Sequence, residues 1–262
     1  MSSAIEVQQL VKRYGRVTAV DGVTLSVDFG EIVGYLGPNG AGKTTTIRCL
    51  LGLLRPSSGS VRLLGEPLPS GLPRVLEDVG HIPGEFGVWP QLTGAGCLDY
   101  LGRLAHRRPR RRAALCERFE LSQTELARQV RYYSRGMRQK IAIVQAFQHD
   151  PELVIMDEPT EGLDPVMNER FLQLLDEHRT AGGSTLCRHT SSPKLSKSPT
   201  EWLCCAPAPW CVKSAGTTWR IESVIARPPS RRVRPPRCRR PCLAHSTSRA
   251  WATPCGSTTG VT

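Results

Sequence analysis

The chain has 262 residues, of which 39% are apolar and 22% charged, enough for one sizeable domain with its own core. This composition excludes a short peptide, a fibrous protein and a fully disordered chain. No apolar run approaches the ~20 residues that cross a bilayer, and the opening sequence MSSAIEVQQLVKRYG lacks the apolar stretch of a secretory signal. We therefore expect a cytoplasmic, soluble protein.

The net charge of +12 is concentrated in one part of the chain. Residues 186–262 carry +11, whereas residues 1–185 carry +1. The basic segment also holds seven of the ten cysteines and four of the five tryptophans, and it has no sustained helical or strand periodicity. Its cysteines lack paired C-x-x-C spacing, which argues against a zinc site. The sequence therefore divides into a balanced globular domain and a segment of different character.

Strand-like and helix-like stretches alternate through residues 1–185. Strands are predicted at residues 5–10, 22–27, 31–36, 60–64, 78–82 and 153–156. Helical periodicity follows Lys43, Arg112, Gly136 and Met167. Alternation of this kind favours an α/β domain built on a largely parallel sheet.

The strand predicted at residues 31–36 runs into GPNGAGKT at residues 37–44, and a helical stretch follows. This is the G-x-x-x-x-G-K-[ST] spacing in its strand-to-helix context. The glycines let the backbone wind so that N–H groups converge on phosphate oxygens at the positive end of a helix. Lys43 is expected to reach the β and γ phosphates, Thr44 to ligate Mg²⁺, and Thr45 to add a hydroxyl contact. The residues assigned to nucleotide binding in this loop are Gly37, Pro38, Asn39, Gly40, Ala41, Gly42, Lys43, Thr44 and Thr45.

The apolar residues at 153–156 are followed by two acids, Asp157 and Glu158. This order is typical of a buried strand that delivers carboxylates at its C-terminal end. Asp157 suits a contact to Mg²⁺, and Glu158 suits the general base that a hydrolase needs beside the attacking water. Because successive residues of a strand point to opposite sides, the two carboxylates are expected to divide these roles.

Between the phosphate loop and the acidic strand lies YSRGMRQK at residues 133–140, followed by an apolar helical run. Together with the two flanking motifs, this segment resembles the signature of the ATP-binding subunits of ABC transporters, usually LSGGQ. Ser134 and Gly136 match the signature serine and second glycine, whereas Arg135 and Met137 depart from the commonest form. An ordinary helix N-cap is the structural alternative for the serine.

The resemblance extends to three further places. Tyr14 matches the aromatic residue that stacks on adenine, and EGLD at residues 161–164 matches the D-loop, which implies that Asp164 lies at a dimer interface. Where the family commonly has the glutamine of the Q-loop, this chain has PGEF at residues 83–86, and Gly84 takes the glutamine's place. The metal or water ligand and the membrane-coupling contact of that glutamine are therefore not carried over.

The resemblance implies a P-loop NTPase core with a mostly parallel sheet, an antiparallel β edge, and a helical signature subdomain at about residues 86–150. It implies an ATPase with ATP and Mg²⁺ as cofactors. Two such subunits, identical or related, would form a head-to-tail dimer in which Ser134 binds the γ-phosphate held by the other subunit. A separate ABC transmembrane permease would hold this motor at the inner face of the cell membrane. The sequence of residues 80–164 most resembles that of single-domain ATP-binding subunits of ABC-2-type exporters.

Two alternatives stay open beside the transport ATPase. A non-transport ABC protein acting on the ribosome or on nucleic acid would share the motifs. Such proteins usually carry two nucleotide domains or a long coiled coil, and the sequence shows one phosphate loop and no heptad run, so a nucleic-acid partner is disfavoured. A defective relic that binds nucleotide without turnover would also keep every motif.

The resemblance of the sequence to the family stops near Thr185. When residues from 186 onward are back-translated and reread in a shifted frame, synonymous choices give LSSHVLSEVEQVTDRMAVLRAGTLVCEVG, which resembles the family's switch loop, helix and strands. We therefore hypothesise that residues 186–262 are translated out of frame, as a disordered tail that leaves a truncated domain at 1–185 without its final helix and edge strands and with an exposed apolar sheet face. A genuine basic tail that binds RNA, DNA or anionic lipid is the rival hypothesis. His189 lies near the expected switch histidine but out of register, so it receives no role.

Overall fold

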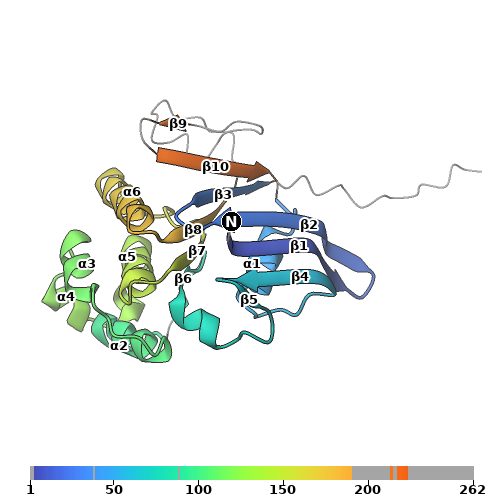
Figure 1. The fold of residues 1–262 in the computed structure, drawn as a ribbon. Helices are drawn as coiled ribbons and strands as arrows, with labels where there is room; N and C mark the ends of the chain where they lie inside the picture. The colour runs from blue at the N-terminus through green and yellow to red at the C-terminus, as the bar shows by residue number, and fades with distance from the viewer. Residues whose placement is uncertain (1–2, 38, 88, 191–212, 215–216, 224–262) are drawn as a thin grey trace, which may run out of the picture. The chain divides into compact units, whose positions relative to one another are not determined.

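The computed structural model describes residues 3–37, 39–87, 89–190, 213–214 and 217–223, all within one compact unit (Figure 1). Pro38 and most of the basic segment lie outside the described residues. Two sheets and a group of helices make up the described part of the chain.

An antiparallel sheet is formed mainly by the first part of the chain. Its strands, in spatial order, are β2 (Val17–Asp28), β1 (Ser3–Tyr14), β4 (Ser58–Leu63) and β5 (Glu66–Pro67). Apolar residues alternate along β2, where Val23, Leu25 and Val27 are buried, as expected of a sheet with one face in the core. The predicted antiparallel β edge is confirmed.

The second sheet has six strands and is largely parallel. Its spatial order is β6 (Val79–Ile82), β7 (Leu153–Asp157), β8 (Ser184–Thr190), β3 (Ile32–Gly37), β10 (Thr217–Ser223) and β9 (Lys213–Ser214). The pairings from β6 to β10 are parallel, and β9 pairs with β10 in the antiparallel direction. All five residues of β7 are buried, which explains why this strand is a continuous apolar run rather than an alternating one.

The helices fall into two groups. The α1 helix (Lys43–Leu50) contacts strands of both sheets, and α6 (Pro165–Thr180) contacts β8. The helices α2 (Gly94–Leu104), α3 (Arg112–Arg118), α4 (Gln123–Ala127) and α5 (Arg135–Phe147) gather together (Figure 1), with short 3₁₀ turns at Arg74–Asp78 and Val130–Tyr132. This second group is the helical subdomain that the family resemblance implies.

Two apolar clusters form the core, and β7 belongs to both. Leu153 and Ile155 pack with the antiparallel sheet and α1. Val154 and Met156 pack with the helical subdomain and α6. Alternate residues of a strand point to opposite faces, so this one strand joins the two halves of the domain. Its C-terminal end is consequently fixed in place from both sides.

The structure differs from the expectation that order ends at Thr185. The strand β8 continues to Thr190, and Leu186 within it is fully buried. Residues of the same segment also form β10, which pairs with β3. Sheet pairing uses backbone N–H and C=O groups, so a segment without a clear core pattern can still supply strands. The reading-frame hypothesis itself is not addressed by this geometry.

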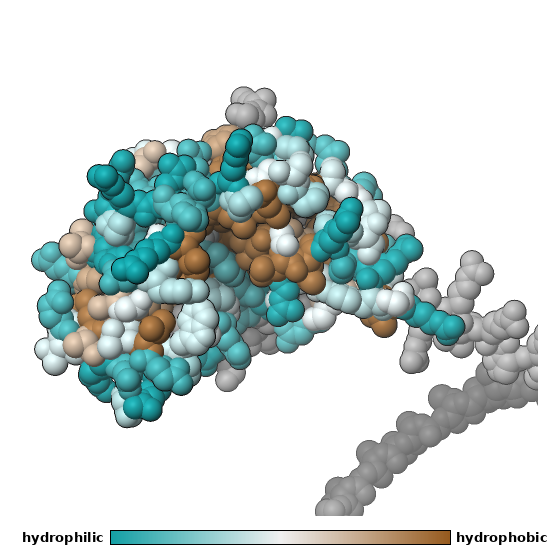
Figure 2. All heavy atoms as spheres, turned by 90° about the horizontal axis from the view of Figure 1, so that it is seen from below, coloured by the Kyte–Doolittle hydropathy of each residue, from teal (hydrophilic) through white to brown (hydrophobic). Residues whose placement is uncertain are grey.

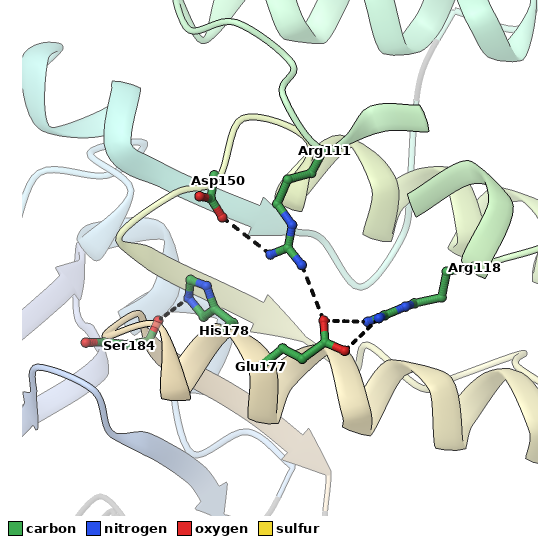
Figure 3. Close-up of polar contacts among 6 residues, drawn as sticks. All are labelled: Arg111, Arg118, Asp150, Glu177, His178 and Ser184. Carbon is green, nitrogen blue, oxygen red and sulfur yellow. Dashed lines mark hydrogen bonds and ion pairs between the residues drawn. The ribbon is translucent and has the colours of Figure 1, made fainter. Parts of the chain in front are cut away.

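A polar network ties the end of α6 to α3 and to the loop before β7 (Figure 3). Glu177 accepts two hydrogen bonds from Arg118, at 2.6 and 2.9 Å, and lies 3.4 Å from Arg111, which also reaches Asp150 at 3.3 Å. The hydrogen bond from Arg118 is the main cause that lowers the pKa of Glu177. Because these groups are partly exposed, each pair is worth about 0.2 to 1 kcal/mol.

His178 lies beside this network but is buried (Figure 3). Its Nε2 atom is 3.4 Å from the carbonyl oxygen of Ser184, and its ring meets Phe147 edge-on with centroids 5.4 Å apart. A Cβ on Gly183 would lie 2.2 Å from the imidazole. Only a glycine therefore allows the backbone to pass this close to the ring. Burial lowers the pKa of His178 below its ordinary value.

We expect the free energy of unfolding to fall as the pH drops below about 6.5, the ordinary pKa of histidine. Burial lowers the pKa of His178, His81 and His149, so the unfolded chain binds protons in a range where the folded chain does not. Each such histidine contributes a slope of up to about 1.4 kcal/mol per pH unit. Urea unfolding at pH 7.5 and 5.5 measures how much the free energy of unfolding falls between the two pH values. This fall should be smaller for His178→Gln than for the unaltered chain. Equal losses would contradict this account.

Candidate nucleotide-binding site

The phosphate loop occupies the turn between β3 and α1. Gly40 and Gly42 have φ values of +82° and +83°, in the left-handed region that favours glycine. A Cβ on Gly42 would lie 2.2 Å from the carbonyl oxygen of Ala19, so glycine is required there by space as well as by backbone conformation. The loop thus depends on β2 for its shape. Of the loop residues assigned to nucleotide, Pro38 lies outside the described residues.

Lys43 begins α1 with its side chain buried. Its ammonium donates a hydrogen bond to the carbonyl oxygen of Gly37, at the start of the loop. Burial lowers the pKa of Lys43, and the nearby Arg188 lowers it further. Thr46, one turn into the helix, donates to the Gly42 carbonyl oxygen at 3.1 Å. The helix start is therefore held against the loop, with the ammonium turned toward the space that the loop surrounds.

Asp157 ends β7, Glu158 follows it directly, and both line one cleft. The prediction that they point to opposite sides is wrong. Glu158 lies outside the strand with φ of +51°, a left-handed conformation that is strained for a residue with a side chain. This turn brings the second carboxylate back toward the first. Burial raises the pKa of Asp157 above its ordinary value, and Arg188 opposes that shift.

Arg188, near the end of β8, contacts both carboxylates. In the parallel register Arg188 is the partner of Asp157, and its Nη1 atom donates to Asp157 Oδ1. Its Nη2 atom lies 3.5 Å from Glu158 Oε1, and its carbonyl oxygen accepts from the Glu158 N–H at 3.0 Å. Sequence analysis missed this residue because it falls in the predicted tail. The signal that could have found it is the pairing register of two strands far apart in the chain.

The cleft beside these residues has a volume of about 700 Å³. Its polar lining includes Thr44, His81, Asp157, Glu158 and Arg188. Gly84 also lines it, and a Cβ there would lie 3.3 Å from Asp157 Cγ. The position that replaces the Q-loop glutamine is thus placed against the acidic strand, as the resemblance implies. His81 faces Asp157 and places its Nδ1 atom 2.9 Å from the Ile155 carbonyl oxygen.

The donor set in the cleft fits a hard divalent cation. The Thr44 hydroxyl and the Asp157 carboxylate supply oxygen ligands, which Mg²⁺ prefers. Within the described ranges, no group of three or more histidine, cysteine, aspartate or glutamate side chains could hold a metal by itself. A metal here would therefore need oxygens from a bound phosphate to complete its coordination, as is usual for Mg²⁺ in phosphoryl-transfer sites.

The signature segment forms the start of α5. Ser134 is exposed, and its Oγ atom accepts a hydrogen bond from the Met137 N–H at 3.2 Å, so this serine is also the N-cap of the helix. A Cβ on Gly136 would lie 2.8 Å from the carbonyl oxygen of Gly162. The signature and the D-loop segment are therefore in close contact, and Arg135 forms an ion pair with Glu161 between them.

Of the predicted site residues, Thr44, Asp157 and Glu158 line the cleft. Ser134 and Gly136 lie outside it, and Tyr14 is 46% exposed at the end of β1, where its ring centroid is 5.2 Å from Lys12 Nζ. Asp164 caps α6 through a hydrogen bond from the Met167 N–H at 2.9 Å. The roles assigned to these residues at the nucleotide stay predictions.

A phosphate loop after a parallel strand, paired acids at the end of a second strand of the same sheet, and a helical subdomain with a serine-capped helix define a nucleotide-binding domain of the ATP-binding cassette class. The profile of the family described as ABC transporter matches residues 20–161, and the chain belongs to this family. Within the described residues, no helix combines the length and the apolar character needed to cross a membrane.

Curated relatives and solved structures agree with this assignment. The chain is 35% identical over 207 residues to "Nod factor export ATP-binding protein I" of Cupriavidus pinatubonensis, covering 78% of this chain and 63% of the relative. It is 39% identical over 199 residues to "Bacitracin transport ATP-binding protein BcrA" of Bacillus licheniformis, covering 75% and 64%. The chain thus spans less than two thirds of these relatives. A solved "ATP binding subunit of ABC transporter" matches with TM-score 0.67 and 32% identity, covering 71% of this chain and 79% of that one.

Alanine substitutions at two glycines of the phosphate loop should separate backbone strain from steric conflict. Gly40→Ala meets no atom within 4 Å and should lower the free energy of unfolding by about 1 to 2 kcal/mol, the usual cost of a left-handed side-chain residue. Gly42→Ala adds the conflict with Ala19 and should cost about 1 to 3 kcal/mol more. Urea unfolding of both variants measures the difference. Equal losses would show that the contact with β2 does not constrain the loop.

Proposed function

We propose that this chain binds and hydrolyses MgATP as the motor subunit of an ABC exporter. The observation that carries the proposal is that Thr44, at the end of the phosphate loop, lines one cleft with Asp157 and Glu158, and that both carboxylates act electrostatically on the adjacent Lys43. Relatives named for Nod factor export and bacitracin transport support the assignment to export.

The proposed chemistry follows from the positions of the charged groups. The backbone N–H groups of the loop and the Lys43 ammonium bind the β and γ phosphates. Thr44 and Asp157 hold Mg²⁺, which when bound neutralises charge on the phosphate oxygens. A water oxygen attacks the γ-phosphorus, the bond from that phosphorus to the bridging oxygen of ADP breaks, and the Glu158 carboxylate accepts the water proton. Arg188 lies 3.5 Å from Glu158 Oε1, and the other oxygen of this carboxylate is the one that accepts the proton.

The proposed assembly places two subunits head to tail, identical or related. An exposed Ser134 at the start of a 13-residue helix offers N–H groups and the positive end of a helix dipole to an anion. Ser134 is not among the residues that line the cleft of its own chain, although the adjacent Arg135 is; in the head-to-tail arrangement that the family resemblance implies, the γ-phosphate that Ser134 binds is the one held by the other subunit. Asp164 and the close contact of Gly136 with Gly162 then lie at the dimer interface.

A permease partner is proposed for the apolar surface. Figure 2 shows apolar side chains gathered around a hollow on one face of the molecule. The large apolar side chains exposed in the structure include Leu53, Trp89, Tyr100 and Leu104. Exposed apolar groups mark surfaces that bind other proteins. Through such a partner the subunit would act at the inner face of the cell membrane, and co-purification with a membrane subunit rather than with nucleic acid would favour transport over a ribosomal or nucleic-acid role.

We also propose that residues 186–262 arise from a shifted reading frame. Two observations support this proposal: the shifted frame yields a sequence that resembles the family, and the segment is basic and rich in cysteine and tryptophan. The strand pairing of Leu186–Thr190 is compatible with this origin because backbone groups, not side chains, make the ladder. Sequencing the DNA across the codons for residues 182–190 tests the proposal. A single unbroken frame in the source DNA, matching the present sequence, would contradict a sequencing error and leave a natural frameshift or a genuine tail.

ATP hydrolysis by the full chain tests the proposed function. Glu158→Gln keeps the shape of the side chain but removes the proton acceptor, so phosphate release should fall by about 10²- to 10⁴-fold while ATP still binds. Glu152→Gln, the same chemical change at an exposed residue before β7, is the matched control and should hydrolyse ATP like the unaltered chain. If Glu158→Gln and the unaltered chain release phosphate at equal rates, Glu158 is not the general base.

A further inference from the structure

The helices α5 and α6 begin close to one another. Ser134 caps α5, and Asp164 caps α6. A Cβ on Gly136 would lie 2.8 Å from the carbonyl oxygen of Gly162, so the two helix starts are in close contact. The proposed function places both capping residues at the dimer interface. Their position relative to one another therefore determines whether two subunits fit together.

The far ends of the same two helices are bridged by Arg111 (Figure 3). Its Nη1 atom lies 3.3 Å from Asp150 Oδ1, just after α5, and its Nη2 atom lies 3.4 Å from Glu177 Oε2 of α6. Its backbone N–H donates to the carbonyl oxygen of Gln148, the C-cap of α5, at 3.0 Å. One residue from the loop before α3 thus contacts the end of each helix.

Contacts between α3 and α6 keep the acid of this bridge in place. Glu177 accepts two hydrogen bonds from Arg118 of α3, at 2.6 and 2.9 Å. Two turns earlier on α6, Arg170 donates to the Arg118 carbonyl oxygen at 2.6 Å and lies 2.7 Å from Glu120 Oε1. Glu177 is therefore fixed from the side of α3, and Arg111 meets it at a defined position.

Polar contacts at the ends can set how α5 and α6 lie relative to one another. Between the ends, apolar side chains of both helices, including Ile141, Phe147, Phe171 and Leu174, belong to one buried cluster. Burial of apolar groups is non-directional and tolerates small changes of angle, whereas hydrogen bonds depend on distance and angle. The 13 residues of α5 span about 20 Å, so a tilt of about 5° about the far end moves Ser134 by about 2 Å.

We infer that Arg111 is a positioning residue, which holds the far ends of α5 and α6 together and thereby sets the position of Ser134 relative to Asp164. The inference rests on the proposed function, because it assigns a determinant of the dimer interface used for ATP hydrolysis. Arg111 touches neither the nucleotide cleft nor the acidic pair. Arg111 and its partners all precede residue 186, so the inference does not depend on the reading frame of the remaining segment.

Hydrogen exchange of the full chain without nucleotide tests whether Arg111 acts over this distance. The reporters are the amides of Met137 and Met167, which bind the capping side chains of Ser134 and Asp164. Arg111→Gln should speed their exchange about threefold or more, because loss of the far contact lowers the free energy of local opening. Arg111→Lys keeps the positive charge and should restore most of the protection. Faster exchange confined to the far ends of the two helices would show a local structural role and overturn the inference.

Arg108 provides the matched control. It belongs to the same basic run at residues 107–112, its side chain is exposed, and it forms no ion pair with another residue that the structure describes. Arg108→Gln makes the same chemical change three positions away and should leave the exchange of both amides as in the unaltered chain. An equal effect of Arg108→Gln and Arg111→Gln would mean that the charge of the run matters and not the bridge, which also overturns the inference.

Association of the full chain gives the second readout. Sedimentation velocity is run with Mg²⁺ and a non-hydrolysable ATP analogue. Arg111→Gln should raise the dimer dissociation constant about three- to tenfold, as expected for the loss of two partly exposed ion pairs, with the affinity of the monomer for the analogue unchanged. Phosphate release from ATP should then fall at low protein concentration and recover at high concentration. A deficit that persists at every concentration would indicate general damage to the fold and overturn the inference.

The outcomes stay separable if a variant or the assembly fails. If Arg111→Gln does not fold, Asp150→Asn removes one arm of the bridge while keeping a residue type that tolerates the φ of +58° at this position. It should also speed exchange at the helix starts, and unchanged exchange would overturn the inference. If the unaltered chain binds the analogue and stays monomeric, or binds no analogue, the proposed dimer or the proposed function fails, and the exchange measurement still decides the role of Arg111.

Discussion

The site depends on the parallel pairing of β7 with its neighbours in the six-stranded sheet. All five residues of β7 are buried, and alternate side chains enter two different apolar clusters. Parallel strands carry their C-terminal ends to one edge of a sheet. The end of β3, which opens the phosphate loop, and the end of β7, which carries the acids, therefore meet without any contact between their side chains being needed to bring them there.

The charged side chains at this edge of the sheet then determine which ligands it can bind. Lys43 is buried with its ammonium against the Gly37 carbonyl oxygen, and the two carboxylates face it across the cleft. Taking charges out of water is costly unless they are paired, so a buried acid pair must find cations. A metal with nucleotide is one solution, and a guanidinium from β8 is another. This chain has both the oxygen ligands for the first solution and Arg188 for the second.

How far the sequence predicts the structure depends on whether a feature is local. The loop GPNGAGKT predicts the end of β3 and the start of α1 because its residue types are tied to one backbone path. The helix α2 escapes prediction: Gly94 and Gly96 lower its helix propensity, and it forms because Thr93 caps it at 3.0 Å while Cys97 and Leu98 are buried. Arg188 escapes for a stronger reason, since its role depends on a strand register set by residues about thirty positions away.

The same reasoning explains why an arginine can change the chemistry of the site without changing the fold. The β ladder is made by backbone groups, and Leu186 and Cys187 of β8 pack against the two core clusters. At the next residue, Arg188, the side chain leaves the core and enters the cleft. Whatever residue stands there is presented to Asp157 by the sheet itself. The sheet therefore fixes the place of this contact, while the residue at position 188 determines its charge.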